Sequence, residues 1–359
     1  MTGGLLTFVR RCGVKNTRSK RRFSKEEQRA RLTAHTLRQQ YTRTELENER
    51  GYHLYKLWEE YKAKGILNQN IGIFWVSKVN AFGKHKGDKI LKRSEMLDFV
   101  AKGGKVREIH HYKDKVTNQC IKNLAHFMDV PMPGQHGFTS QRNVFTNLGV
   151  HLKTENNSIL NIDLEDAFHQ VSQKDVYYIL KRVFDINAKT ATEMASFFCE
   201  NGRLFQGCPV SPLIFNIYTA NLAKSMAGIK WLTFSQYADD LTFSLKEEYI
   251  SHRLIKWLIS IIEDCGCRAN PSKVVRQRLR PNTNGGEVTG IKVWHTSAHH
   301  WRTKPRNGNV TENNLRLLEY LMAKGLQFSR RTAKNGSQIP LMNIKEGLTC
   351  WRQNATANT

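Results

Sequence analysis

A pair of consecutive aspartates between two apolar segments constrains this sequence more than any other feature. Leu232–Tyr237 and Leu241–Leu245 both have the composition of buried β-strands, and the acids lie between them. The pattern predicts a hairpin whose four-residue turn, Tyr237–Asp240, projects Asp239 and Asp240 from its tip. An Asp-Asp turn on a surface is usually structural. Beside buried strands, however, paired charges are costly unless a cation compensates them, which favours a hard divalent ion with oxygen ligands.

A single turn cannot complete a metal site, so a further acid is expected at the end of a neighbouring strand. Asp163 lies near the end of an apolar run, Ser158–Leu164, that also predicts a strand. Together Asp163, Asp239 and Asp240 are suited to hold two Mg²⁺ ions about 3.5–4 Å apart, the arrangement used in phosphoryl transfer, with Mn²⁺ as the alternative metal. Without the Asp-Asp hairpin, Asp163 would be interpreted as a helix N-cap.

These segments resemble the sequence boxes of reverse transcriptases. Tyr237–Asp240 resembles the Y-x-D-D box, and Asp163 with Phe168 five residues later resembles the first catalytic motif. Gln206–Pro212 matches the Q-G-x-x-x-S-P box that lies between them. Three boxes in the right order are far rarer by chance than one Y-x-D-D match, so the resemblance is specific.

Two further segments resemble the retron subfamily. Val288–Gly290 matches the V-T-G triplet typical of retron reverse transcriptases. Asn147–His151 resembles their N-A-x-x-H signature, although Leu148 stands where that family has alanine. The segment with specific motifs covers roughly residues 70–295, and the basic segments outside it match only in character.

The resemblance and the alternation of elements imply an α+β, right-hand polymerase fold with fingers, an antiparallel palm sheet and a helical thumb. The expected divisions are a basic helical N-terminal extension at 1–65, fingers at 66–160, a palm at 161–300 and a thumb or C-terminal RNA-binding region at 301–359.

Local patterns predict further elements. Leu97–Ala101, Gly103-Gly104 and Lys105–Tyr112 predict a hairpin, because a Gly-Gly pair supplies the positive φ angles of a tight turn. Apolar spacing and capping residues predict helices over about 44–64, from Ser211 to near Met226, over 250–264 and over 311–324.

The resemblance also assigns nucleotide-binding residues. Lys105 and Arg107 would hold the triphosphate, arginine through two parallel hydrogen bonds. Phe168 occupies the position that excludes a ribose 2′-hydroxyl, and Gln206-Gly207 opens a loop in which glycine permits close backbone approach. Lys273, in an N-P-S-K segment, would neutralise or protonate the leaving pyrophosphate. The alternatives are a core aromatic for Phe168 and ordinary solvated charges for the basic residues.

The charge balance indicates a polyanionic partner. The chain has 56 Lys and Arg against 31 Asp and Glu, a formal net charge of +25, which favours nucleic acid over an anionic membrane surface. Basic residues concentrate at 10–31 and 271–334, and aromatics interleave the second segment, as in surfaces that bind unpaired bases. A satisfied core histidine is the alternative for His151. The candidates for binding RNA or template-primer are Arg21, Arg22, Asn147, His151, Val288, Thr289, Gly290, Arg302, Arg330 and Arg331.

The resemblance implies a reverse transcriptase that uses dNTPs to copy a cognate structured noncoding RNA. Priming from an RNA 2′-hydroxyl would give branched, RNA-linked single-stranded DNA, in an antiphage system with a separate effector protein. The alternatives are a group II intron-like reverse transcriptase and a non-catalytic RNA-binding scaffold, which the three carboxylates disfavour. Apolar runs fall short of the ~20 residues of a membrane span, and the cysteines lack a disulfide framework, so a bacterial cytoplasmic protein without membrane attachment is expected.

Overall fold

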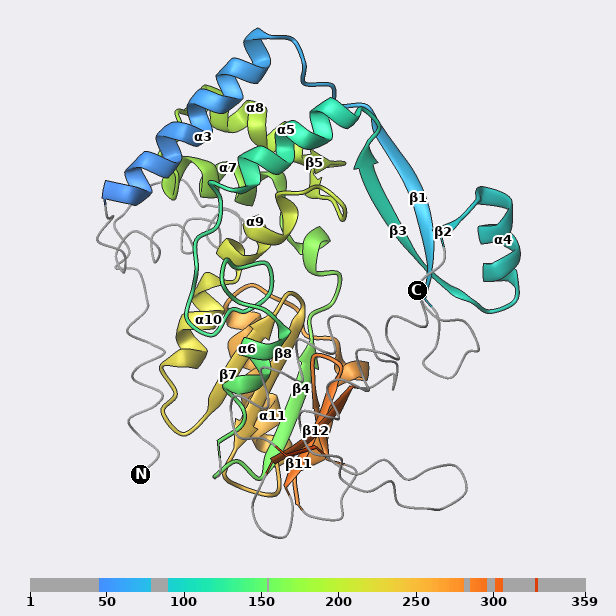
Figure 1. Ribbon diagram of the computed structural model, residues 1–359, viewed down its shortest axis with the longest axis vertical. Helices are drawn as coiled ribbons and strands as arrows, with labels where there is room; N and C mark the ends of the chain where they lie inside the picture. The colour runs from blue at the N-terminus through green and yellow to red at the C-terminus, as the bar shows by residue number, and fades with distance from the viewer. Residues whose placement is uncertain are drawn as a thin grey trace, which may run out of the picture.

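The computed structural model describes residues 45–78, 90–153, 155–280, 285–295, 301–305 and 327–328. Figure 1 shows a helical end and, at the opposite end, a sheet with helices packed around it. The α+β class with antiparallel pairing is confirmed. The predicted thumb helix at 311–324 and the basic segment at 10–31 lie outside the described residues.

A central four-stranded sheet has the order β7-β8-β4-β9. Its strands are β4 (Ser158–Asp163), β7 (Thr233–Tyr237), β8 (Asp240–Leu245) and β9 (Val275–Arg278), and neighbouring strands are antiparallel. The strands expected from the three apolar runs are therefore confirmed, with bounds shifted by a residue. Because side chains alternate along a strand, each strand supplies residues to both faces of this sheet.

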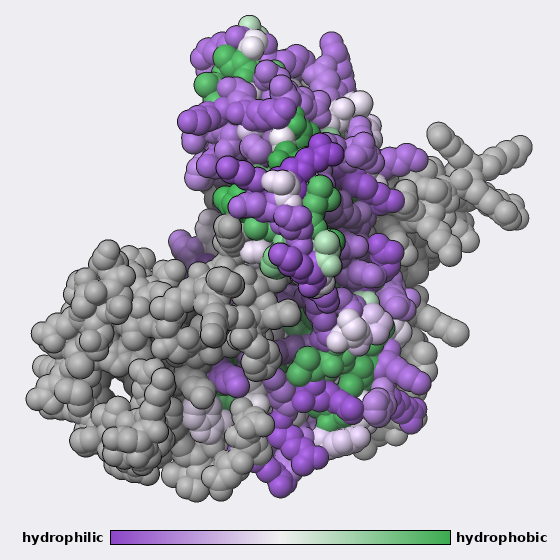
Figure 2. Space-filling view, turned by 90° about the vertical axis from the view of Figure 1, so that its right-hand side faces the viewer, coloured by the Kyte–Doolittle hydropathy of each residue, from purple (hydrophilic) through white to green (hydrophobic). Residues whose placement is uncertain are grey.

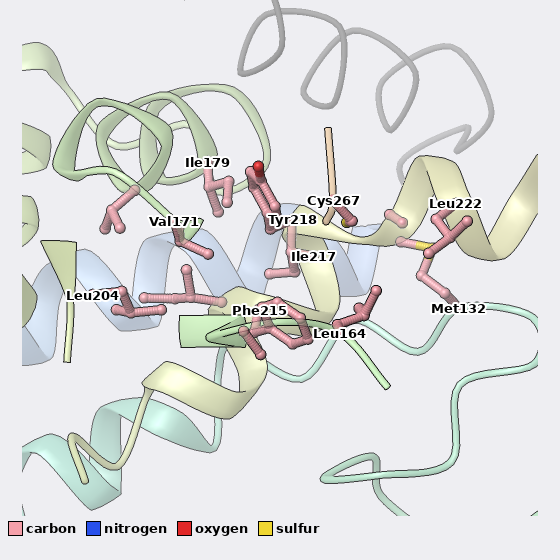
Figure 3. Packing of buried hydrophobic residues seen from close by; sticks show 14 of the residues in the cluster. Met132, Leu164, Val171, Ile179, Leu204, Phe215, Ile217, Tyr218, Leu222 and Cys267 are labelled. Atoms are coloured by element: carbon pink, nitrogen blue, oxygen red, sulfur yellow. The ribbon is translucent and has the colours of Figure 1, made fainter. Parts of the chain in front are cut away.

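One face of the central sheet packs on the main hydrophobic core. Leu160, Ile162, Phe234 and Phe243 belong to this buried cluster. Figure 3 shows part of it, with Phe215, Ile217 and Tyr218 among the labelled side chains that pack together. The helices that contribute are α3 (Glu45–Ala63), α5 (Lys115–Ala125), α7 (Gln173–Arg182), α8 (Ala188–Phe198), α9 (Ser211–Tyr218), α10 (Ala220–Ala227) and α11 (His252–Asp264).

The opposite face carries Ile159, Asn161 and Asp163, and a smaller core covers part of it. Ile159 packs there with Leu148, which lies on α6 (Val144–Gly149), and with residues of a second sheet. That sheet has the order β10-β11-β12-β13, with strands β10 (Gly286–Val288), β11 (Ile291–His295), β12 (Trp301–Pro305) and β13 (Gln327–Phe328). The Asp163 side chain, at the end of β4, therefore lies on the face of the sheet away from the main core.

The expected hairpin around Gly103-Gly104 is wrong. Leu97–Ala101 belongs to a helix, α4 (Arg93–Ala101), and β3 (Lys105–Tyr112) pairs instead with β1 (Ile71–Lys78), which β2 (Ile90–Leu91) joins at its other edge. Gly103 has φ +78°, and the Gly104 N–H donates to the Phe99 carbonyl at 2.9 Å, so the glycines end the helix. A positive φ serves a helix C-terminus as well as a turn.

The helix expected from Ser211 to near Met226 is interrupted at Thr219, between α9 and α10. The Thr219 hydroxyl donates to the carbonyls of Phe215 at 3.1 Å and Asn216 at 3.2 Å, and this local bonding competes with the regular helix. The same oxygen accepts from the Gln236 side-chain amide at 3.0 Å. The interruption thus ties the helices to β7. The helices expected at 44–64 and 250–264 are confirmed as α3 and α11.

Short elements complete the described structure: η1 (Ala167–Gln170), η2 (Pro271–Lys273), β5 (Cys199–Glu200) and β6 (Arg203–Leu204). Figure 2 shows that hydrophilic residues cover most of the described surface on that side, with hydrophobic residues in small separate groups. Among the described helices, none combines the length and apolar character that a bilayer span demands.

Candidate active site

The two aspartates lie at the tip of the β7–β8 hairpin, which we call the carboxylate hairpin. Tyr237 pairs with Asp240, so the expected four-residue turn Tyr237–Asp240 has Ala238 and Asp239 as its two central residues. Ala238 has φ +56°, a left-handed conformation that is strained for a residue with a Cβ. The strain is consistent with a turn whose backbone is fixed by its surroundings.

The register of the central sheet brings the third carboxylate to the same place. Asp163, the last residue of β4, pairs directly with Asp240, and the Leu164 N–H donates to the Asp239 carbonyl at 2.9 Å. Directly opposed residues in antiparallel strands present their side chains on the same face. The structure therefore pairs Asp163 with Asp240 and places the turn residue Asp239 next to them through its backbone.

Burial and mutual repulsion disfavour the ionised forms of two of these acids. Burial raises the pKa of Asp239 above its usual value, and the negative charge of Asp163 raises it further. Burial of the carboxyl group, with the charges of Asp239 and Asp163, raises the pKa of Asp240 to about 6, although the residue as a whole is exposed. Lys273 and Arg107 lower the pKa of Asp239, so these cations act against the repulsion. The site is short of positive charge.

The N-P-S-K segment aims Lys273 at the carboxylates. Asn270 caps η2 by accepting from the Ser272 N–H at 3.1 Å, and its own N–H donates to the Asp163 carbonyl at 2.8 Å. The ammonium of Lys273 then donates to Asp163 Oδ2 at 2.7 Å. The lysine is half exposed while the Asp163 side chain is largely covered. Lys273 is thus a partner of Asp163 and is not an isolated solvated charge.

The donor chemistry of this site fits a hard divalent cation. The three carboxylates at this end of the central sheet repel one another. Oxygen donors of this kind are what Mg²⁺ and Mn²⁺ prefer. Across the described ranges, however, no three His, Cys, Asp or Glu side chains converge closely enough to form a metal-binding group. The ion pair of Lys273 with Asp163 supplies a positive charge at one of the three acids.

The strand β3 joins the remaining nucleotide-site candidates to this region. Lys105 and Arg107 are exposed on β3, and the pKa of Asp239 shows that the charge of Arg107 acts on the carboxylate hairpin. Further along β3, the His110 N–H donates to the Gln206 carbonyl at 2.9 Å. A Cβ at Gly207, where φ is +116°, would lie 2.0 Å from the His110 carbonyl oxygen. Gly207 thus permits close packing of β3 on the Gln206-Gly207 loop.

Replacing Gly207 by alanine is expected to destabilise the protein by about 2–4 kcal/mol, because strain at positive φ adds to a clash with backbone. Gly202 is the matched control: its φ is +73°, but nothing lies within 4 Å of an added Cβ. Gly202→Ala should therefore cost only about 1 kcal/mol. Chemical denaturation of both variants measures the difference, and equal losses would show that the contact with His110 is unimportant.

Phe168 occupies an intermediate position between core and surface. It lies in η1 and packs edge-to-face against Phe215, with ring centroids 5.7 Å apart and an interplanar angle of 68°. It remains partly exposed, whereas Phe215 is 1% exposed. The core contact fixes the Phe168 ring and leaves part of it accessible to solvent.

The retron-like signature residues are buried. Asn147, His151 and Val288 have no exposed surface, and His151 bridges the carboxylate hairpin through Ser244 Oγ at 2.5 Å and Ser235 Oγ at 2.7 Å. This favours the satisfied core histidine, and direct RNA contact would require the covering residues to move. Thr289 and Gly290, both at positive φ, form the turn between β10 and β11. Arg302 lies on β12, but its side chain is not among the described parts of the structure. Arg21, Arg22, Arg330 and Arg331 lie outside the described residues.

The burial of His151 predicts acid sensitivity. Burial, with the charges of His136 and Lys153, lowers the pKa of His151 from 6.5 to about 3. Between these values the unfolded chain binds a proton that the folded chain excludes, so stability falls as the pH falls from 6.5 towards 3. This residue alone should lower the unfolding free energy by about 2 kcal/mol between pH 7 and pH 5. Denaturation at both pH values should show a smaller loss in His151→Gln, and an identical loss would contradict the assignment.

The sequence indicates a Pro- and Gly-rich loop at 131–134 but not its contact with the carboxylate hairpin. The buried Gln135 side-chain amide donates to the Asn216 carbonyl at 2.8 Å and to Thr219 Oγ1 at 2.9 Å. A Cβ at Gly137 would lie 2.5 Å from the Ala238 nitrogen, so this glycine lets the loop pack on the turn. Its only sequence signal is a cluster of proline and glycine at 131–137, which does not identify a contact partner.

Comparisons with known proteins agree with this geometry. Residues 92–299 match the family model described as reverse transcriptase (RNA-dependent DNA polymerase). The chain is 30% identical over 164 residues to the Escherichia coli retron Ec86 reverse transcriptase, covering 45% of this chain and 49% of that protein. It is 26% identical over 230 residues to the Myxococcus xanthus retron Mx65 reverse transcriptase, covering 57% and 52%. The chain thus spans about half the length of these curated relatives.

Among solved structures, telomerase from Candida albicans in complex with a fragment of telomeric RNA matches with a TM-score of 0.43 and 14% identity, covering 86% of this chain and 60% of that chain. A telomerase complex from Candida tropicalis matches with a TM-score of 0.42 and 13% identity, covering 84% and 57%. The right-hand fold class expected from the sequence is confirmed by the match to the family model together with the antiparallel central sheet.

Proposed function

The chain belongs to the reverse transcriptase family, and we propose that it is an RNA-directed DNA polymerase that uses dNTPs. The observation that carries the proposal is the pairing of Asp163 on β4 with Asp240 of the carboxylate hairpin, next to the turn residue Asp239. Lys273 and Arg107 place positive charge beside them. Proteins that transfer phosphoryl groups combine acids for cations with basic residues for phosphates in this way.

Each residue has a role that its chemistry supports. Asp163, Asp239 and Asp240 would hold divalent cations, which we propose to be two Mg²⁺ or Mn²⁺ ions; bound there, the metal would lower the pKa of a primer hydroxyl and offset charge on phosphate oxygens. Arg107 and Lys105 would bind the triphosphate, with the arginine able to donate two parallel hydrogen bonds.

The other nucleotide-site residues would position the substrate. Lys273 would exchange its Asp163 contact for the leaving pyrophosphate, to which it can donate a proton or a hydrogen bond. Gln206 and Gly207 would form the loop against which the nucleotide or template lies, held in place by β3. The Phe168 ring would exclude a ribose 2′-hydroxyl and so select deoxynucleotides.

Similarity to retron reverse transcriptases supports a narrower proposal. The chain would copy a cognate structured noncoding RNA, starting from an RNA 2′-hydroxyl, into branched RNA-linked single-stranded DNA. We further propose a cytoplasmic role in antiphage defence with a separate effector protein. Residues 66–160 would form the fingers, 161–300 the palm and 301–359 a thumb or RNA-binding region after the basic extension at 1–65.

The test is expression of the full chain together with the noncoding RNA encoded beside its gene, followed by extraction of small nucleic acids. RNase-resistant single-stranded DNA is the expected product, and sensitivity of its RNA link to a 2′,5′-debranching enzyme identifies the priming chemistry. DNA without a branch would retain the polymerase and reject the retron route, as in a group II intron-like enzyme. Absence of DNA synthesis on any RNA template would favour the RNA-binding scaffold instead.

A further inference from the structure

Two tryptophans form an exposed stack on the palm, away from the carboxylates. Trp231 and Trp257 have ring centroids 6.0 Å apart and an interplanar angle of 26°. Trp257 lies on α11 and packs partly against the main core, whereas Trp231 is 45% exposed. One ring face of Trp231 rests on an anchored partner, so the solvent-accessible area belongs to its remaining face and edges.

Basic residues lie next to both tryptophans in the sequence. Lys230 adjoins Trp231, and Lys256 adjoins Trp257; Arg253 lies one turn before Trp257 on α11, on the same side of the helix. All three cations are exposed. No ion pair within the described part of the chain involves any of them.

The acids closest in sequence are engaged or lie further along. Glu263 and Asp264 are in the last turn of α11, beyond the stack. Glu248, before the helix, forms an ion pair with Arg280. The exposed charges next to the two tryptophans in the sequence are therefore basic, and this favours a ligand that combines negative charge with flat apolar surface.

The stack is remote from the candidate active site. Trp231 precedes β7, whereas the carboxylate turn follows the other end of that strand, about 20 Å away at 3.3 Å per residue. Ile255 and Leu258 of α11 belong to the main core, which covers the sheet face opposite the one bearing Asp163. The helix α11 therefore lies on the side of the central sheet opposite the Asp163 side chain.

We propose that Trp231, Trp257, Lys230, Arg253 and Lys256, the tryptophan platform, bind a single-stranded stretch of nucleic acid outside the polymerase cleft. An unpaired base stacks on the free face of Trp231, and neighbouring phosphates contact the cations. Aromatic faces with adjacent basic residues are the general means of binding unpaired strands without sequence preference. The inference rests on the proposed polymerase function for its biological sense, but its geometry is independent of the carboxylates.

The test measures binding by fluorescence anisotropy of a labelled 20-nucleotide RNA and a DNA of the same sequence. Saturating unlabelled hairpin template-primer, with one unpaired template base, occupies the polymerase cleft. Trp231→Ala should weaken binding about tenfold, because loss of base stacking has effects of this size, whereas Trp231→Tyr should retain most of the affinity. The double variant Arg253→Ala/Lys256→Ala should reduce the slope of log affinity against log salt by about 1.4.

The controls separate this surface from general charge and from catalysis. Lys122→Ala, on the exposed side of α5, removes one charge far in sequence from the tryptophan platform. It should leave the affinity unchanged apart from a small electrostatic effect. Extension of the short hairpin should proceed at wild-type rate in every platform variant. If the variants lose more affinity for RNA than for DNA, the platform binds the template or the structured RNA. If they lose equal affinity for both, the platform binds single-stranded RNA and DNA alike.

The proposal is overturned if Trp231→Ala and the double variant both bind RNA and DNA as tightly as wild type. The charge variant decides the matter should Trp231→Ala unfold, since its substitutions are on the helix surface. An inactive wild-type protein with platform-dependent binding would reject the polymerase and keep the platform. Normal primer extension together with binding that none of the platform substitutions changes would keep the polymerase and reject the platform.

Discussion

Asp239→Asn is expected to lower DNA synthesis on an RNA template by at least about 10³-fold, because the loss of one carboxylate removes several kcal/mol of stabilisation from a cation-dependent phosphoryl transfer. The same substitution should leave thermal stability unchanged or raise it. Burial and the charge of Asp163 raise the pKa of Asp239, which means that its ionised form is unfavourable in the folded protein. Asparagine keeps the shape and removes the repulsion.

Two measurements made on the same preparation check this expectation: primer extension with dNTPs and a thermal melt. Asp98→Asn is the matched control, since Asp98 is an exposed acid on α4 and its amide should change neither quantity. Wild-type extension rates in Asp239→Asn would contradict the assigned role. If the melting temperature of Asp239→Asn fell far enough to unfold the protein at the assay temperature, the loss of activity would be attributed to unfolding.

The carboxylate site could be predicted because its information is local. The alternation of apolar strands around Tyr237–Asp240 gives the hairpin, and Asp163 at the end of another apolar run gives the neighbouring strand. What the pattern did not predict is the backbone conformation inside the turn. Ala238 has a strained φ of +56°, and propensity alone disfavours this conformation for alanine.

Apart from the pairing of Asp163 with Asp240, contacts between segments far apart in sequence could not be predicted. The close approach of Gly207 to the His110 carbonyl and of Gly137 to Ala238 depends on how loops meet in space. The bridge from His151 to Ser235 and Ser244 likewise joins a loop after α6 to two strands. The error at Leu97–Ala101 has a related cause, since apolar residues over five positions fit either a strand or a helix, and tertiary pairing of β3 with β1 decides between them.

Phe168→Val is expected to let the enzyme incorporate ribonucleotides, narrowing its preference for deoxynucleotides by about 10²-fold or more. Removing one methylene from a hydrophobic pocket changes discrimination between two substrates by only about 10–200-fold. Removing a ring that would block the ribose 2′-hydroxyl takes away a steric barrier, so the effect on sugar preference should be larger. The edge-to-face contact with Phe215 holds this ring in one orientation, so the barrier is rigid. Valine retains the apolar surface towards Phe215 and opens the space that the ring occupies.

Competition between a dNTP and the matching rNTP in single-nucleotide extension measures this preference, as the ratio of the two kcat/KM values. Phe168→Tyr, which retains the ring, should keep the wild-type ratio. If Phe168 were only a core aromatic, valine would lower the melting temperature and both kcat/KM values together, leaving their ratio unchanged. A change in the ratio at equal stability is what a residue facing the sugar must produce, because packing loss alone does not distinguish two nucleotides that differ by one hydroxyl.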